Sequence, residues 1–312
     1  MEHEIAISIL IPTFRRAVLL TRAVESCLAQ DVPESLPFEI VVIDNDPERS
    51  AEATVAALAI RASRPLRYVH QPEPGVSMAR NAGVAAARGQ YAAFLDDDER
   101  ASPQWLRQLR GALDHGGDAA FGLIEEEFEE EPKLMEDIAR RCFSRDLEVP
   151  QGTDITSRFN YVGTGNSMFH IQSCFGGKKE PFKRALSATG GEDTVFIAEL
   201  VAEGKRLVWA ADAKAWEFVP KDRTQPAYLM RRRYFSGRNR TVSVAQPTVK
   251  GLMLSTLWMG VGAAQAILFG FPGLLLAPVS KRISYPLLAV AAGGMGKLLW
   301  WLPSGAKRYV VD

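Results

Sequence analysis

Residues 38–46 read FEIVVIDND, and residues 91–98 read YAAFLDDD. Each stretch is a short apolar run that stops abruptly at acidic residues. Residues 5–13, IAISILIPT, form a third apolar run, which ends at Pro12 and Thr13. Continuous apolar runs of this length are typical of strands that are covered on both faces of a parallel sheet. We therefore expect a strand in each run.

Helical patterns alternate with these strands along the first 225 residues. Alternation of strands and helices is the signature of βαβ units, so we expect an α/β fold with a Rossmann-like, mostly parallel sheet flanked by helices. Ser102 is expected to cap the fourth helix, with Pro103 in its first turn. No regular element is expected between residues 150 and 190. The expected helices are 16–30, 51–62, 77–88, 103–113, 133–146 and 193–203, and further strands are expected at 66–70, 119–124 and 207–211.

The overall composition limits the partners of the protein. The chain has 312 residues and a formal net charge of zero, so its total charge gives no reason to expect a nucleic-acid partner. Its three cysteines have no metal-ligand spacing and provide no disulfide framework. The N-terminus lacks the basic start of a signal peptide, so we expect the folded part to lie on the cytosolic side of a membrane.

The polar residues that follow the strands are expected to form one site. Ligands of open α/β sheets bind outside the carboxyl ends of the strands, where Thr13, Asp44 and Asp96 would come together. The alternative is that aspartate simply favours the turns after strands. That alternative accounts for one such cluster better than for three.

The acidic triplet Asp96-Asp97-Asp98 predicts a metal site. Three adjacent carboxylates repel one another and are costly without a counter-ion. A hard divalent cation, Mg²⁺ or Mn²⁺, takes carboxylate oxygens and bridges to phosphates. Alternate residues of an extended segment point the same way, so Asp96 and Asp98 are the expected pair. A charge cluster before the helix that starts at Pro103 is the competing interpretation.

Two glycine-containing segments precede helices. Gly75 opens the helix that carries Arg80, where backbone donors and a guanidinium would meet an anion. The pair Gly190-Gly191 precedes Glu192 and Asp193, and it indicates a close approach of the backbone to a ligand. Simple helix capping is the alternative in both places. Neither G-x-G-x-x-G after a strand nor G-x-x-x-x-G-K-[ST] occurs in the sequence.

Taken together, these segments resemble the family 2 glycosyltransferases with the GT-A fold, from residue 5 to about residue 220. Within that family the chain is most similar to bacterial exopolysaccharide glucosyltransferases of the succinoglycan type. The motifs that carry the resemblance occur in the family's order: ILIPTF at 9–14, IDND at 43–46, GVSMARNAG at 75–83, FLDDD at 94–98 and GED at 191–193.

The resemblance implies an inverting, metal-dependent transfer from a nucleotide sugar, with a uridine diphosphate sugar as the expected donor. It makes Asp193 the catalytic base and Glu192 the second candidate. It assigns the metal to Asp98 and Asp96. Many relatives carry a metal-binding histidine near the end of the domain, where this chain has Trp216-Glu217-Phe218, so Glu217 is the candidate for that role. The implied donor-binding residues are Pro12, Thr13, Arg15, Asp44, Asp46, Arg80, Asn81, Asp96 and Asp97.

The C-terminal region, residues 226–312, is expected to be a basic linker followed by a membrane-associated helical tail. Arg231, Arg232 and Arg233 precede an uncharged stretch at 252–279, which is longer than the roughly 20 apolar residues that span a bilayer. A second apolar stretch follows at 283–302. Basic residues beside apolar segments favour the cytoplasmic face and anionic lipids. Prolines and glycines leave spanning, re-entrant and interfacial arrangements open.

We therefore expect an enzyme of the bacterial cytoplasmic membrane, with its catalytic domain facing the cytoplasm. Its acceptor would be a lipid-linked or growing polysaccharide, and its other partners would be membrane lipids. The alternative is a catalytically silent scaffold that binds a nucleotide sugar within a polysaccharide-synthesis complex. The joint presence of Asp44, the acidic triplet and Asp193 favours the enzyme.

Overall fold

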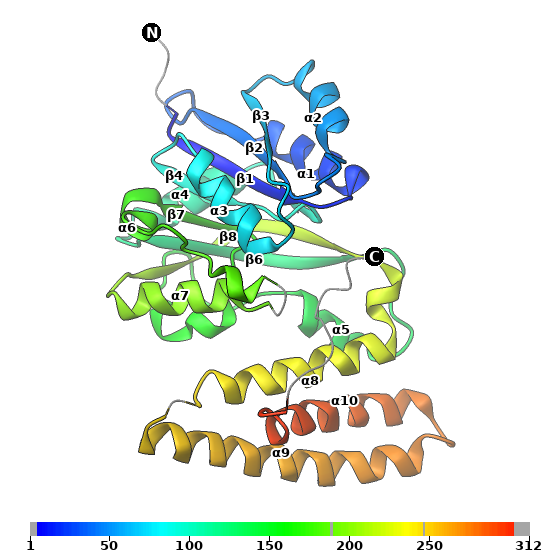
Figure 1. Cartoon of the computed structure of the whole chain (residues 1–312). Coiled ribbons are helices and arrows are strands. Elements are labelled where there is room, and N and C mark those ends of the chain that lie inside the picture. Colours follow the sequence, from blue (N-terminus) through cyan, green and yellow to red (C-terminus); the bar gives the residue numbers. More distant parts are fainter. Residues whose placement is uncertain (1–4, 188–189, 246, 303–312) are drawn as a thin grey trace. The chain divides into compact units, whose positions relative to one another are not determined.

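The computed structural model describes residues 5–187, 190–245 and 247–302 (Figure 1). Among these, residues 5–125 and 144–218 form one compact unit, and residues 126–143 and 219–302 form a second. The sequence had placed the division at residue 225 and had assigned the whole of 126–143 to the first domain. The last part of the expected tail, residues 303–312, lies outside the described residues.

The first unit is built on a mixed sheet with the strand order β3-β2-β1-β4-β7-β6-β8-β5. The strands β3, β2, β1 and β4 are parallel to one another, as the βαβ pattern predicts. Strand β7 pairs antiparallel with both β4 and β6, and β8 pairs antiparallel with β5, so the parallel part is the N-terminal half of the sheet. The strands are β1 (Ile7–Thr13), β2 (Phe38–Asp44), β3 (Leu66–His70), β4 (Tyr91–Phe94), β5 (Glu99–Ala101), β6 (Ala119–Phe128), β7 (Ser167–His170) and β8 (Leu207–Val219).

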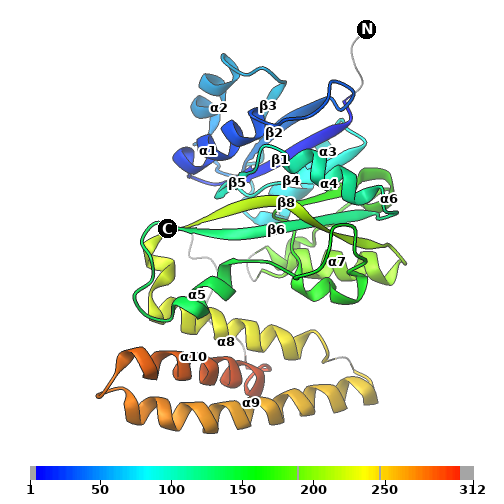
Figure 2. The same ribbon diagram turned by 180° about the vertical axis from the view of Figure 1, so that it is seen from behind.

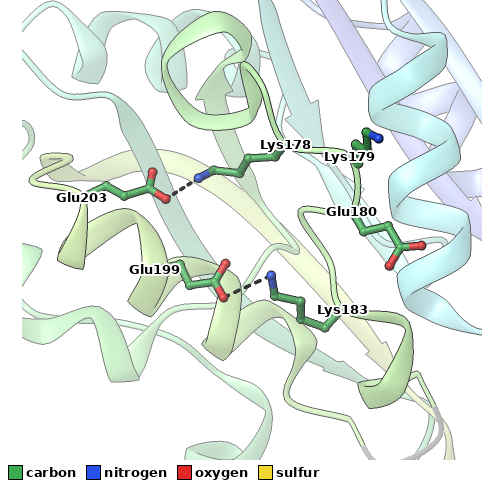
Figure 3. A pocket seen from close by; sticks show the side chains of 6 residues that line it. All are labelled: Lys178, Lys179, Glu180, Lys183, Glu199 and Glu203. Atoms are coloured by element: carbon green, nitrogen blue, oxygen red, sulfur yellow. Dashed lines mark hydrogen bonds and ion pairs between the residues drawn. The ribbon is translucent and has the colours of Figure 1, made fainter.

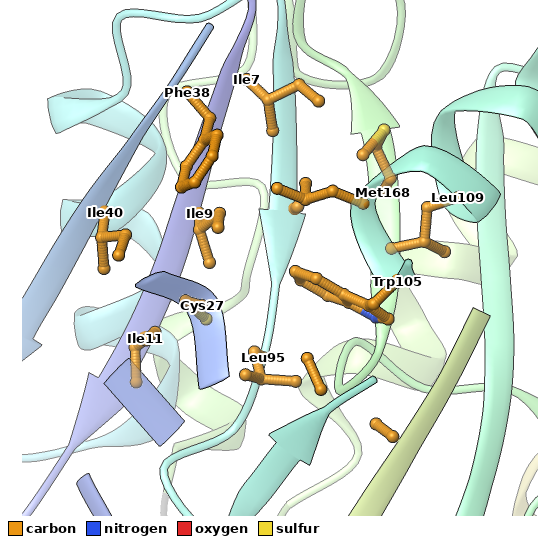
Figure 4. Close-up of a cluster of buried hydrophobic side chains, with 14 of the residues drawn as sticks. Ile7, Ile9, Ile11, Cys27, Phe38, Ile40, Leu95, Trp105, Leu109 and Met168 are labelled. Atoms are coloured by element: carbon orange, nitrogen blue, oxygen red, sulfur yellow. The ribbon is translucent and has the colours of Figure 1, made fainter. Parts of the chain in front are cut away.

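Helices cover both faces of this sheet because alternate residues of a strand point to opposite sides. Ile7, Ile9 and Ile11 pack against the helices of one face, where Cys27 and Trp105 meet them (Figure 4). Leu10 belongs to the core of the other face. Figures 1 and 2 view the sheet from opposite sides and show α3 and α4 on its two faces. The first face is covered by α1 (Ala17–Leu28), α2 (Glu52–Ala59) and α4 (Trp105–Leu113), and the second by α3 (Val76–Ala86), α6 (Ile171–Phe175) and α7 (Glu192–Ala202).

Strand β7 was not expected from the sequence. It lies inside the segment 150–190, together with the short 3-10 helices η1 (Thr156–Tyr161) and η2 (Arg184–Leu186). Its four residues, SMFH, are too few to show an alternating pattern. They form a strand because β4 and β6 pair with them on either side. A central position in the sheet thus imposes a conformation that the local sequence does not signal.

The expected cap at Ser102 is wrong. The helix α4 begins at Trp105, its N-cap is Gln104, and no side chain caps it. The backbone N–H of Ser102 donates to the Lys214 carbonyl, and the Ser102 carbonyl accepts from Gln30. Ser102 therefore joins neighbouring segments instead of starting the helix.

The second unit consists mainly of helices. Its core contains Phe143, Leu229 and Ala289. Glycines let the backbones of its helices approach closely: a Cβ on Gly237 would lie 2.0 Å from the Gly293 carbonyl oxygen, and one on Gly262 would lie 2.5 Å from that of Gly294. The helices are α5 (Glu136–Phe143), η3 (Lys221–Thr224), α8 (Pro226–Val242), α9 (Val249–Leu276) and α10 (Lys281–Leu298).

The apolar tail forms two continuous helices, and Pro272 does not interrupt α9. By length and composition, α9 is apolar enough to cross a membrane, and only 11% of its most apolar window is buried in the protein. Its outward side chains are large and hydrophobic, namely Leu252, Met253, Leu257, Ile267, Leu268, Phe271, Leu274 and Leu275.

Candidate active site

The carboxyl ends of the parallel strands bring the expected polar residues to one edge of the sheet. Thr13 is paired in register with Asp44 across β1 and β2. The Thr13 hydroxyl donates to Asp97 Oδ2 at 2.8 Å, which joins the ends of β1 and β4. The sequence therefore predicted correctly that these strand ends converge.

Arginines already balance the acidic triplet. Arg16 donates from one nitrogen to Asp97 Oδ1 at 3.0 Å and to Asp98 Oδ2 at 2.9 Å. Arg80 lies 3.5 Å from Asp96 Oδ1. A metal would therefore not be the sole counter-charge of the three carboxylates, because two guanidinium groups already offset part of their mutual repulsion.

The three aspartates differ in their access to solvent. The side chain of Asp96 is 39% exposed, whereas that of Asp97 is 7% exposed. Burial raises the pKa of Asp97 to about 6, against the opposing effect of Arg16. Burial, followed by repulsion from Asp98 and Asp193, raises the pKa of Asp96, which Arg80 opposes. Asp97 thus serves mainly to hold Thr13 and Arg16, and Asp96 is available to a ligand.

The residues expected to supply the base occupy two different environments. Glu192 is 5% exposed and accepts from Arg80 at 2.5 Å through Oε1. Its second oxygen, Oε2, is buried without a hydrogen-bond partner among the described residues. Burial is the main cause that raises the pKa of Glu192. Glu192 is therefore committed to a buried ion pair between α3 and α7.

Asp193 is only partly buried and faces the acidic triplet. Its Oδ1 accepts from the Thr194 backbone N–H at 2.7 Å, so this oxygen holds the first turn of α7. Its Oδ2 lies beside Gly163, where an added Cβ would come within 2.8 Å. The charge of Asp193 acts on Asp96. One oxygen of Asp193 thus has a structural task, and the other faces the site.

The glycine pair before α7 is explained by backbone conformation. Gly190 and Gly191 have φ angles of +72° and +91°, which residues with a side chain rarely adopt. A Cβ on Gly191 would meet no atom of the described residues within 4 Å. Gly191 is thus required by its left-handed conformation at the N-cap of α7 and not by close packing against the described part of the chain.

Two expected donor-binding residues, Asp44 and Asn81, use their polar atoms in hydrogen bonds within the fold. Asp44 is fully buried and accepts from the backbone N–H groups of Asp46 and Ala51 and from the Tyr68 hydroxyl. Asn81 donates to and accepts from the backbone of Phe182. These contacts fit the turn-forming alternative for Asp44 and make Asn81 a clamp on the loop before α7.

Arg15 and Asp46 form a bidentate ion pair, with distances of 3.0 and 3.1 Å. The carboxylate of Asp46 is buried, whereas 44% of the Arg15 side chain is exposed. Arg15 has a φ of +53°, a left-handed conformation that non-glycine residues seldom adopt. The pair fixes the turn after β1 and leaves a guanidinium edge open to solvent. Pro12 is the next-to-last residue of β1, paired with Ile43.

Glu217 lies beside the triplet, although it is distant in sequence. It is paired with Glu99 across β5 and β8, and the next residue, Phe218, donates its backbone N–H to the Asp98 carbonyl at 2.7 Å. Burial raises the pKa of Glu99 well above its usual value, with Asp96 as the next cause. Glu217 is therefore adjacent to the site, as a metal role requires.

Arg145 is a central residue that the sequence analysis missed. Its guanidinium donates to the carbonyls of Gly122, Gly163, Gly165 and Asn166. It is partly buried and lies among acidic side chains, since Glu99, Asp96, Asp193 and Glu217 all act on its charge. Burial lowers the pKa of Arg145, against the effect of these carboxylates. Arg145 thus shapes the loop at residues 163–166 and supplies positive charge beneath the carboxylates.

The donor chemistry fits a divalent metal that is shared with a phosphate. Within the described ranges, no three His, Cys, Asp or Glu side chains are arranged to hold a metal by themselves. Mg²⁺, however, is commonly held by one or two carboxylates together with substrate phosphates and water. Asp96 and Asp98 supply such oxygens, and Glu217 lies at their side.

A separate surface depression of about 540 Å³ lies between α7 and the preceding loop (Figure 3). It is lined by Lys178, Lys179, Glu180, Lys183, Glu199 and Glu203. Lys178 pairs with Glu203, and Lys183 pairs with Glu199 at 3.3 Å. None of the predicted site residues lines it, and four of its six charged side chains pair with one another, so it is not assigned to the chemistry at the strand ends.

Comparison with known proteins agrees with the family that the sequence motifs resemble. The model of the family described as glycosyl transferase family 2 matches residues 8–186. The succinoglycan biosynthesis protein ExoM of Rhizobium meliloti (strain 1021) is 30% identical over 286 residues, which cover 91% of this chain and 89% of the relative. The GalNAc(5)-diNAcBac-PP-undecaprenol beta-1,3-glucosyltransferase of Campylobacter jejuni is 27% identical over 49% of this chain and 48% of its own.

Among solved structures, TarS of S. aureus in complex with UDP-GlcNAc has a TM-score of 0.53 at 16% identity, covering 94% of this chain and 90% of TarS. At this identity the likeness concerns the fold alone, and it agrees with the GT-A architecture that the sequence predicted.

Proposed function

The chain belongs to glycosyltransferase family 2, and from this premise we propose that it moves a sugar from a nucleotide sugar to a hydroxyl of a lipid-linked or growing polysaccharide. The family is one of glycosyl transferases, one relative is named as a succinoglycan biosynthesis protein, and another is named as a glucosyltransferase of an undecaprenol-linked acceptor; these names support the proposal. A uridine diphosphate sugar is the proposed donor. The proposal further includes inversion at the anomeric carbon and dependence on a divalent metal.

The observation that carries the proposal is the position of Asp193. This carboxylate is partly exposed and lies in the electrostatic field of Asp96, whereas its neighbour Glu192 is held by Arg80. In the proposed reaction Asp193 takes the proton of the acceptor hydroxyl as the hydroxyl oxygen bonds to the anomeric carbon. The bond from that carbon to the diphosphate oxygen breaks, and the electron pair leaves with the nucleoside diphosphate. Attack opposite the leaving group inverts the centre.

Asp96 and Asp98, with Glu217 beside them, are the residues that we propose to hold the metal. A bound Mg²⁺ or Mn²⁺ would neutralise charge that develops on the leaving diphosphate, which is worth several kcal/mol. Arg16 and Arg80 hold the same carboxylates in place when the donor is absent. The exposed edge of Arg15 provides a further cation for the donor phosphates.

The donor pocket is proposed to lie along the ends of β1, β2 and β4. Asp96 is its most exposed acidic side chain, Arg80 lies beside Asp96, and Asp46 would act through Arg15, which it holds in place. Asp44 and Asn81 would support this pocket without contacting the donor, because their polar atoms are hydrogen-bonded to the protein backbone. Pro12, Thr13 and Asp97 fix the strand ends on which the donor would rest.

Attachment to the bacterial cytoplasmic membrane, with the first unit in the cytoplasm, is proposed from the second unit. Most exposed side chains of α9 between Leu252 and Leu275 are apolar, and the arginines of α8 are suited to anionic lipid. Lipid is therefore a proposed partner of the helical unit, in addition to the acceptor.

A screen of nucleotide sugars with the purified protein tests the function. Release of nucleoside diphosphate in the presence of Mn²⁺ or Mg²⁺, lost in EDTA, is the expected result. The silent-scaffold alternative predicts that nucleotide sugar binds and that no diphosphate is released with any donor or acceptor. Binding without turnover across the screen would therefore replace the proposal by that alternative.

A further inference from the structure

The helices α8, α9 and α10 lie side by side within the second unit (Figures 1 and 2). Gly262 of α9 lies against Gly294 of α10, and Gly237 of α8 lies against Gly293, at distances that no side chain would permit. These contacts join the central parts of the helices and not only their ends. The three helices therefore enter a membrane, or lie on it, as a group.

The helix α8 is strongly charged, and it runs along α10. Leu229 shares a core with Ala289, and the Thr241 hydroxyl donates to the Lys297 carbonyl at 3.4 Å. These two contacts are roughly 18 Å apart along α8 at the rise of an α-helix. If α9 and α10 crossed the bilayer, α8 would be drawn into the hydrocarbon with them, where charged side chains are costly. The arginines of α8 between the two contacts are Arg231, Arg232, Arg233, Arg238 and Arg240.

Charged side chains also contact α9 far from its ends. The Lys297 ammonium donates to the amide oxygen of Gln265, in the central part of α9, at 2.7 Å. The Trp258 ring of α9 has the Arg240 guanidinium carbon 5.4 Å from its centre and the Lys297 ammonium 6.0 Å from it. A spanning α9 would carry these cations to membrane depth. One side of α9 thus faces a polar environment along much of its length.

The turn between α9 and α10 is basic as well. The helix α9 ends at Leu276, and α10 begins at Lys281. Lys281 and Arg282 are both exposed, and a hairpin that crossed the membrane would place them on its far side. Lysine and arginine beside apolar segments are found preferentially on the cytoplasmic side. The turn and the basic helix α8 therefore favour the same side of the membrane.

The other side of α9 is apolar and bulky. Leu257, Ile267 and Phe271 are 61%, 70% and 66% exposed, whereas Gly262 and Gly273 are buried against the neighbouring helices. A helix that is apolar on its free side and has polar neighbours on the other is suited to a membrane interface. There the apolar side sinks about 5–10 Å into the boundary between headgroups and acyl chains.

We propose that α9 lies in the plane of the membrane and enters one leaflet only. Its outward side contacts the acyl chains of the cytoplasmic leaflet, and α8 and the turn at 277–280 stay on the cytoplasmic side. Anionic headgroups of that leaflet attract basic segments beside the membrane, and Lys281 and Arg282 supply such a segment. This inference rests on the proposed membrane attachment, and it selects the interfacial arrangement from the three that the sequence left open.

The test determines from which side a cysteine in the turn reacts with a membrane-impermeant maleimide. Ser280→Cys in the full chain changes one atom, at a side chain that makes no cap hydrogen bond. Inverted membrane vesicles expose the cytoplasmic side, spheroplasts expose the opposite side, and detergent gives the maximum labelling. Ala56→Cys, at an exposed position of α2, is the control in the first unit. Wild type gives the background from its three native cysteines.

We expect Ser280→Cys to react in inverted vesicles to the same fraction of its maximum as Ala56→Cys. In spheroplasts both variants should stay at the wild-type background. Val279→Cys, at the preceding position, should give the same pattern, because the Val279 side chain is exposed. Agreement between the two turn variants excludes a local distortion by either substitution.

Three results would overturn the proposal. Labelling of both turn variants in spheroplasts alone would show a spanning hairpin, and labelling in detergent alone would show a re-entrant one. Either result leaves the membrane attachment intact. Recovery of the wild-type chain from the soluble fraction as a dimer would assign the outward side of α9 to a second copy and refute the attachment itself. None of these results depends on turnover, so failure here is distinguishable from failure of the transferase proposal.

Discussion

Asp193→Asn removes the proposed base and keeps the shape of the side chain. Asparagine retains an oxygen that can accept from the Thr194 backbone N–H, so the first turn of α7 should persist. Its amide cannot take the acceptor proton. We expect turnover to fall by about 10²–10⁴-fold, the usual contribution of a positioned base. This corresponds to about 2.7–5.4 kcal/mol of activation free energy.

The neighbouring substitution Glu192→Gln should mainly lower the stability of the protein and should affect turnover less. Glu192 is buried against Arg80 at 2.5 Å, and removal of one charge from a buried pair typically costs about 3–5 kcal/mol of stability. Because glutamine can still accept one hydrogen bond and Arg80 also lies 3.5 Å from Asp96, we expect about 3 kcal/mol, near the lower end. Turnover per folded molecule should fall less than in Asp193→Asn.

The assay measures transfer rate, donor affinity and melting temperature for both variants, with Asp212→Asn as a control that makes the same chemical change at an exposed position. Asp193→Asn should lose turnover with little change in donor affinity or melting temperature. Turnover near the wild-type value in that variant would remove Asp193 from the mechanism. A larger loss of turnover in Glu192→Gln would make Glu192 the base.

Four further results are expected. Asp98→Ala, or EDTA, should weaken the binding of nucleoside diphosphate in calorimetric titration, and equal affinity in all three conditions would refute the metal assignment. The pKa of Asp97 is raised from 3.8 to about 6 in the folded protein, so the folded state favours the protonated carboxyl group. The resulting contribution to the free energy of unfolding is full below pH 3.8 and is lost as the pH rises through 6. Asp97→Asn in EDTA should therefore remove this dependence of the free energy of unfolding on pH. At pH 7 the variant should be more stable than wild type by about 3 kcal/mol, as measured by urea unfolding. Arg145→Lys keeps the charge but cannot serve four carbonyls, so it should lower both melting temperature and turnover, whereas a change in melting temperature alone would limit Arg145 to a structural role. Lysine at both Leu257 and Phe271 should allow salt to extract the protein from membranes, and a continued need for detergent would show that the outward side of α9 is not the anchor.

The parallel half of the sheet could be predicted from the sequence because its signals are local. Each of β1, β2 and β4 is a continuous apolar run, and the residues that follow it are polar and lie at the same edge in any parallel arrangement. The two apolar helices of the tail could be predicted for the same reason, since their composition is uniform over many residues. The acidic triplet and the pair Glu192-Asp193 were also visible, because each is contiguous in the chain.

The sequence did not reveal which carboxylates are free to react. Glu192 and Asp193 are adjacent and chemically similar, and only the position of Arg80, over a hundred residues earlier in the chain, buries one in an ion pair and leaves the other facing the site. Arg16 balances Asp97 and Asp98 across 81 and 82 residues of sequence. The sequence indicated Arg80 only as a contact for an anion, and no local pattern marked Arg16 as a partner of the carboxylates.

Local hydrophobic pattern and composition are carried by neighbouring residues, so the sequence by itself determined the strand ends, the family motifs and the apolar tail of this protein. Burial and charge balance depend on which distant segments the fold brings together. The tertiary structure alone therefore decided that four carbonyls surround Arg145, that the buried carboxylate of Asp44 bonds to its own turn, and that Arg240 and Lys297 lie beside the same tryptophan, Trp258.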